Sequence, residues 1–125
     1  MADLRILAVD DSPTMRRIIV NTLKRAGYND ITEATDGRDA LAKMKVSDFN
    51  FVITGWNMPE MDGIEFVSRV RNTPEMRAIP ILMVTARSVQ EDIVTAVRAG
   101  VNSYIVKPFS PDTLKEKIEE VLAGK

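Results

Sequence analysis

Five short apolar runs alternate with five segments whose apolar residues recur at helical spacing, and this alternation restricts the fold more than any other feature of the chain. The expected strands are Leu4 to Val9, Ile31 to Ala34, a central run beginning with Phe51 to Ile53, Ile81 to Thr85, and Ser103 to Val106. Such alternation predicts a parallel sheet with helices on both faces. Because crossovers between parallel strands are right-handed, the carboxyl ends of all the strands should lie at one edge. We therefore expect an α/β, doubly wound fold in one domain, residues 1–125.

Local signals indicate where the helices begin and end. Expected caps and stops are Ser12-Pro13, Asp62 with Glu65 ahead of a helix from Gly63 to about Arg71, Ser88 with Glu91, Ser110-Pro111, and the glycines 27 and 100, whereas Asp36-Gly37 is expected to be a turn. The core-facing stripes should be Met15, Ile18, Ile19, Leu23 and Ala26; Ala40, Leu41 and Met44; Phe66, Val67 and Val70; Val89, Ile93, Ala96 and Val97; and Leu114, Ile118, Val121 and Leu122. Arg16 and Arg17 are expected on the solvated face of the first helix.

Composition narrows the function. A 125-residue chain that is 45% hydrophobic fits one core, and a net charge of −1 gives no electrostatic case for nucleic acid or an anionic membrane. No window approaches the ~18 apolar residues of a membrane span, and the start MADLRILAVDDS is unlike a signal peptide, so we expect a cytoplasmic protein. The chain has no cysteine and no histidine. Any phosphohistidine chemistry would therefore need a histidine from a partner.

The stretch FVITGWNMPEMDG, residues 51–63, should carry the chemistry. It begins as a buried central strand and breaks at Gly55, where the chain reaches the carboxyl edge of the sheet. Ligands of open α/β folds bind at that edge. The residue at this position has no side chain.

Polar residues are expected at the ends of other strands. Asp10 and Asp11 follow the first strand, Thr85 ends the fourth, and Lys107 follows the fifth. Each has an ordinary structural explanation, such as a solvated strand end or a turn, but their joint placement favours a site. Adjacent carboxylates suit Mg²⁺, whereas a lysine and a hydroxyl suit phosphoryl oxygens.

The motifs AVDDS, FVITGWNMPEMDG, MVTA and NSYIVKPF together resemble the receiver domain of two-component response regulators, over essentially the whole chain. Within that family the likeness is strongest to the stand-alone chemotaxis regulators. The resemblance implies a (βα)5 flavodoxin-like fold with strand order 2-1-3-4-5. It also implies a signalling protein, not an enzyme, that receives a phosphoryl group from a kinase histidine onto an aspartate beside Mg²⁺.

The resemblance assigns roles to particular positions. Asp10 and Asp11 correspond to the metal-binding acids, and the backbone carbonyl of Asn57 to a further metal ligand. Thr85 and Lys107 correspond to phosphoryl-contacting residues. The remaining match is Tyr104, which with Thr85 forms the family's switch.

Gly55 departs from the family pattern because it corresponds to the phosphoacceptor aspartate. Phosphorylation there should be disabled, and Mg²⁺ should bind weakly or not at all. Thr54 is a poor substitute, since adjacent strand residues point to opposite faces. Lys107 should turn to Asp10, Asp11 or water, because an unpaired buried charge is costly. A natural pseudo-receiver and a substituted working receiver both fit, and the otherwise complete site favours the substitution.

The expected partners are a sensor histidine kinase and a flagellar motor switch protein or other signalling protein. The output surface is expected around the fourth helix, fifth strand and fifth helix of a monomer. The alternatives are a phosphorylation-independent binding module and a Mg²⁺-dependent aspartyl phosphatase of the haloacid dehalogenase type. That phosphatase class has an aspartate two residues after its nucleophile, where this chain has Ser12 after Asp10. A flavin-binding role is disfavoured by DDSPTM, whose acids repel phosphate.

Overall fold

The computed structural model describes residues 4–124 and has five strands and five helices in strict alternation. The elements are β1 (Arg5–Val9), α1 (Pro13–Arg25), β2 (Asp30–Ala34), α2 (Gly37–Val46), β3 (Phe51–Thr54), α3 (Gly63–Arg71), β4 (Ile81–Thr85), α4 (Gln90–Ala99), β5 (Ser103–Val106) and α5 (Pro111–Gly124). All strand pairs are parallel, in the order β2-β1-β3-β4-β5. The predicted fold class and strand order are confirmed. The first two strands differ from expectation by one residue at their starts.

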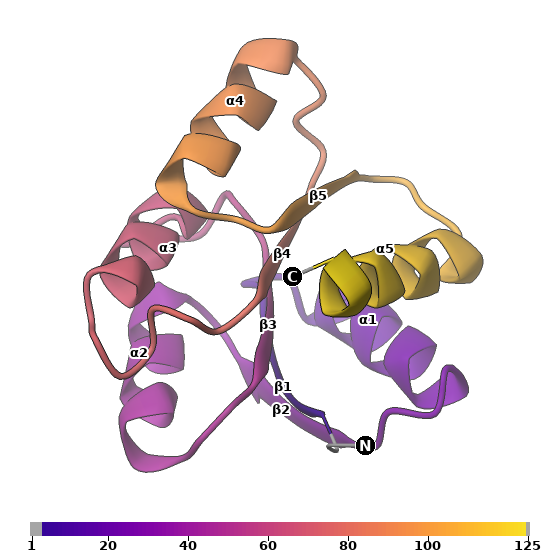
Figure 1. Cartoon of the computed structure of the whole chain (residues 1–125). Helices are drawn as coiled ribbons and strands as arrows, with labels where there is room; N and C mark the ends of the chain where they lie inside the picture. The colour runs from indigo at the N-terminus through magenta and orange to yellow at the C-terminus, as the bar shows by residue number, and fades with distance from the viewer. Residues whose placement is uncertain (1–3, 125) are drawn as a thin grey trace.

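The sheet lies between two layers of helices (Figure 1). Helices α1 and α5 cover one face, and α2, α3 and α4 cover the other. The central strand β3 is covered by helices on both faces, which explains its run of apolar residues. Phe51 and Ile53 pack with the α1 and α5 side chains, whereas Val52 packs with α2 and α3.

Most of the predicted caps form. Ser12 Oγ accepts a hydrogen bond from Met15 N at 3.1 Å, and Asp62 Oδ1 accepts one from Glu65 N at 2.9 Å. The expected capping box of Ser88 and Glu91 is wrong. The N-cap of α4 is Val89, which makes no side-chain cap hydrogen bond. Its carbonyl accepts from the amides of residues 92 and 93, so the first turn closes one residue later than the sequence pattern suggested.

Four residues predicted to face the core are instead partly exposed, by 39% to 57%: Ile18, Val89, Val97 and Leu122. Helix α4 shows the reason most clearly, because Ala96 is its one buried residue. Helix α4 packs near the β5 end of the sheet (Figure 1), where only a narrow stripe of a helix can reach the core. Val97, the next residue after Ala96, is rotated out of that stripe.

Within residues 4–124, no helix is long and apolar enough to cross a membrane.

Candidate functional site

The register of the sheet brings the predicted strand-end residues to one edge. Gly55, directly after β3, donates its amide to the Val9 carbonyl at 2.9 Å, which sets it beside Asp10. On the other side, the Lys107 amide donates to the Thr85 carbonyl at 2.9 Å. The expected convergence at one carboxyl edge is therefore confirmed.

Asp10 is the central acid of this cluster. It is 4% exposed, Oδ1 accepts from Ser12 N at 2.9 Å, and Oδ2 lies 3.8 Å from Lys107 Nζ. Burial raises the pKa of the Asp10 carboxyl, and the Ser12 amide and the Lys107 charge only partly oppose this. Lys107 thus turns to Asp10, as expected for a chain without a carboxylate at position 55. Asp11, the second predicted acid, is exposed.

Gly55 lies against the Asp10 side chain. A Cβ on residue 55 would be 2.9 Å from Asp10 Oδ2 and 3.4 Å from its Cγ. Asp10 therefore fills the space in which a side chain on residue 55 would begin. The loop beyond is held close by Gly63, where a Cβ would overlap the Gly55 carbonyl oxygen, and Gly63 N donates to the Trp56 carbonyl at 2.7 Å.

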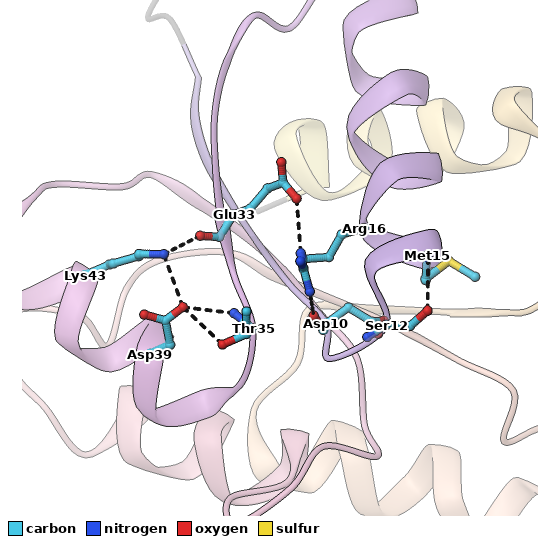
Figure 2. A network of polar contacts seen from close by, with 8 residues as sticks. All are labelled: Asp10, Ser12, Met15, Arg16, Glu33, Thr35, Asp39 and Lys43. Atoms are coloured by element: carbon cyan, nitrogen blue, oxygen red, sulfur yellow. Dashed lines mark hydrogen bonds and ion pairs between the residues drawn. The ribbon is translucent and has the colours of Figure 1, made fainter.

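Arg16 bridges the end of β1 and the neighbouring strand β2 (Figure 2). Its Nη1 donates to the Asp10 backbone carbonyl at 2.6 Å, and its Nε donates to Glu33 Oε1 at 3.1 Å. The Glu33 carbonyl in turn accepts from Lys43 Nζ at 2.6 Å, which ties the end of β2 to α2. The Arg16 side chain is only 15% exposed, so its expected place on the solvated face is wrong. Arg17 is exposed as expected.

Arg16 lies one helical turn after the Ser12 cap. Side chains of a helix point back toward its N-terminus, and that direction carries Arg16 over the strand end. The direction of the Arg16 side chain therefore follows from its distance to the cap, but no sequence pattern identifies the Asp10 carbonyl as its partner.

The two predicted switch residues meet the main chain of one loop residue, Arg87. Thr85 is 3% exposed, and its Oγ1 accepts from Arg87 N at 3.2 Å. The Tyr104 hydroxyl donates to the Arg87 carbonyl at 2.7 Å. Tyr104 is half-buried, and burial, followed by the charge of Asp92, raises the pKa of its hydroxyl.

The side chain of Arg87 reaches the loop after β3. Its guanidinium carbon lies 4.4 Å from the centroid of the Trp56 ring, and Nη2 donates to Asn57 Oδ1 at 2.8 Å. Nη1 lies 3.6 Å from Asp92 Oδ2. Asn57, whose backbone carbonyl was predicted as a metal ligand, is itself exposed. Sequence reasoning missed Arg87, because an arginine in a loop carries no periodic or capping signal.

The model of the response regulator receiver domain matches residues 6–119. The chain belongs to the response regulator receiver family. It is 51% identical over 120 residues to the chemotaxis protein CheY1 of Helicobacter pylori strain ATCC 700392 / 26695, covering 95% of this chain and 97% of that one. It is 49% identical over 119 residues to chemotaxis protein CheY-3 of Vibrio cholerae, covering 95% and 92% of the two chains.

Solved structures agree. The structure of Vibrio cholerae chemotaxis protein CheY4 superposes with a TM-score of 0.89 at 40% identity, covering 96% of this chain and 99% of that one. The receiver domain of the sensor histidine kinase PA1611 from Pseudomonas aeruginosa PAO1, at 27% identity and a TM-score of 0.87, covers 98% and 99% and has a magnesium ion coordinated in its active-site cleft. This chain is thus a CheY-like receiver domain, and proteins of this type are signalling proteins rather than enzymes.

Proposed function

We propose that this chain is a chemotaxis receiver module in which Gly55 occupies the phosphoacceptor position, so that it accepts no phosphoryl group there. One observation carries the proposal. A side chain on residue 55 would start 2.9 Å from Asp10 Oδ2, the same oxygen that lies 3.8 Å from Lys107 Nζ. Thr54 cannot replace the missing nucleophile, because it is fully buried and its Oγ1 donates to the Gly55 carbonyl at 3.0 Å.

The oxygen atoms present do not fit a complete Mg²⁺ shell. Receiver domains typically bind Mg²⁺, a cation that is reluctant to lose its waters and depends on well-placed carboxylates. Among residues 4–124, no three acidic side chains are grouped closely enough to hold a metal ion. Asp10, the buried acid, already uses Oδ1 for the Ser12 amide and directs Oδ2 toward Lys107. We therefore infer weak Mg²⁺ binding and assign the metal no step.

The proposed partners are a histidine kinase and a flagellar motor switch protein. We propose that the chain acts in the cytoplasm as a monomer. The names of the relatives, which are chemotaxis proteins, support this setting. The surface of α4, β5 and α5 is the proposed docking face. In its favour, α4 and its N-cap expose three apolar side chains, Val89, Val94 and Val97.

The phosphatase alternative gains no support from the site. Ser12 stands where that class has its second acid, and its hydroxyl is engaged in capping α1. A binding module that works without phosphorylation remains compatible with the proposal, since the docking face does not depend on residue 55.

The proposal can be tested in a motile bacterium that lacks its own chemotaxis regulator of this type. The chain as it stands should not restore kinase-dependent reversal of the flagellar motors, whereas Gly55→Asp should restore it. A matched Gly55→Asn variant should behave like the original chain. Kinase-dependent reversal with the original chain would overturn the proposal.

A further inference from the structure

Arg87 contacts two parts of the molecule that are distant in sequence. One is the loop after β3, and the other is the predicted switch pair, Thr85 and Tyr104. We propose that Arg87 couples the packing of Trp56 to the inward position of the Tyr104 ring, in which the Tyr104 hydroxyl donates to the Arg87 carbonyl. We call this coupling the Arg87 latch. The coupling uses the side chain of Arg87 at one end and its main chain at the other. It does not require a phosphoryl group or a metal ion, so it stands apart from the proposed role of Gly55.

The side-chain end is the stack on Trp56. The indole is 7% exposed, and the guanidinium lies over it while also donating to Asn57 Oδ1. Arg87 Nε is buried without a hydrogen-bond partner among the described residues. A buried donor without an acceptor is unfavourable, so the stack and the other guanidinium contacts hold the side chain in place.

The main-chain end is a pair of hydrogen bonds to the switch residues. Arg87 N donates to Thr85 Oγ1, and Arg87 O accepts from the Tyr104 hydroxyl. The position of the Arg87 backbone therefore decides whether the Tyr104 hydroxyl reaches its acceptor. A change at Thr85 or at Tyr104 is transmitted to the other of the two through the main chain of Arg87.

The segment that follows Arg87 adds little restraint of its own. Ser88 and Val89 are exposed, and Val89 caps α4 without a side-chain hydrogen bond. Apart from the ion pair with Asp92 at 3.6 Å, the Arg87 side chain is fixed by the contacts on Trp56 and Asn57. Release of the guanidinium should thus free the loop and the Tyr104 hydroxyl together.

The test uses the fluorescence of Trp56, the only tryptophan of the chain. Tyr104→Phe removes the hydroxyl and keeps the ring, and it should shift Trp56 emission to longer wavelength. Arg87→Met should produce a shift of its own, and adding Tyr104→Phe to Arg87→Met should change nothing further. The control Arg98→Met, on an exposed position of α4, should leave the response to Tyr104→Phe intact.

Two outcomes would overturn the latch. One is unchanged Trp56 emission in Tyr104→Phe, and the other is an additive shift in the double variant. A second measurement is independent of fluorescence. Trp56→Leu should accelerate hydrogen exchange of the Arg87 amide at least several-fold and leave the Ile105 amide unchanged, and an unaltered Arg87 amide would equally refute the coupling. Circular dichroism of each variant confirms that the fold is retained.

Discussion

Placing an aspartate at position 55 perturbs the site in a way that the structure quantifies. The new Cβ would lie 2.9 Å from Asp10 Oδ2, closer than carbon and oxygen normally approach, so the Asp10 side chain must rotate. The main chain itself can accept the change, because Gly55 is not among the glycines with positive φ in residues 4–124. The cost should therefore come from Asp10 and from charge, and not from backbone strain.

The expected loss of stability follows from three contributions. Rotation of Asp10 gives up the hydrogen bond from the Ser12 amide, a loss of about 1 kcal/mol. A third carboxylate beside Asp10 raises at least one carboxyl pKa, and each unit corresponds to about 1.4 kcal/mol. Replacing glycine returns about 0.4–1 kcal/mol through the unfolded chain. The net expectation is that Gly55→Asp is less stable by about 2 kcal/mol near pH 7 in chelator.

Urea unfolding in chelator measures this difference, with Gly55→Asn as the control of equal size and no charge. The free energy of unfolding should be lower for the aspartate variant than for the asparagine variant at neutral pH. The gap should close at acid pH, where the carboxyls are protonated, and Mg²⁺ should restore only the aspartate variant. Equal stability of the two variants in chelator at neutral pH, or no response to Mg²⁺, would refute the reasoning.

Three further expectations concern the chain as it stands and its acid cluster. Titration with Mg²⁺ should leave Trp56 fluorescence without a saturable change in the submillimolar range, and such a change would contradict the inferred weak site. Because burial raises the pKa of Asp10 above its ordinary 3.8, the folded chain binds that proton more tightly than the unfolded chain, and stability is lost as pH rises through the raised value. Asp10→Asn should lack this loss. In urea unfolding, its free energy of unfolding should therefore rise relative to that of the original chain between acid and neutral pH, and a difference that is constant with pH would contradict the raised pKa of Asp10. Arg16→Met should lower the free energy of unfolding by about 1–3 kcal/mol through loss of the Asp10 carbonyl bond, whereas the neighbouring control Arg17→Met should stay within about 0.5 kcal/mol; equal effects would show that Arg16 has no special role.

The order of elements and the cluster at the sheet edge could be predicted because they depend on periodic patterns. Buried parallel strands need continuous apolar runs, and right-handed crossovers then decide where Asp10, Thr85 and Lys107 meet. The strand order itself came from resemblance to a family, since periodicity does not specify which strands are neighbours. The caps at Ser12 and Asp62 were predictable for the same local reason, namely a side-chain oxygen that meets free helical amides.

The contacts of long polar side chains were not predictable in this way. Arg16 was expected on a solvated helix face and Arg87 was not singled out at all, yet Arg16 donates to the Asp10 carbonyl and Arg87 stacks on Trp56. Their partners are distant in sequence or belong to the main chain, and no pattern of residue types encodes them. Val97 was misassigned for a different reason. An apolar stripe predicts which side of a helix faces the core, but how much of that side is buried depends on the elements packed against it.

The central claim is that this receiver lacks only the nucleophile at residue 55. The most direct test is the intact mass of the chain after incubation with Mg²⁺ and a small acyl phosphate or phosphoramidate, beside the same measurement on Gly55→Asp and Gly55→Asn. Phosphoryl transfer depends mainly on positioning and charge neutralisation, so supplying the carboxylate beside Thr85 and Lys107 should suffice. We expect one added phosphoryl group on Gly55→Asp and none on the original chain or on Gly55→Asn. A phosphoryl group on the original chain, or none on Gly55→Asp, would contradict the central claim.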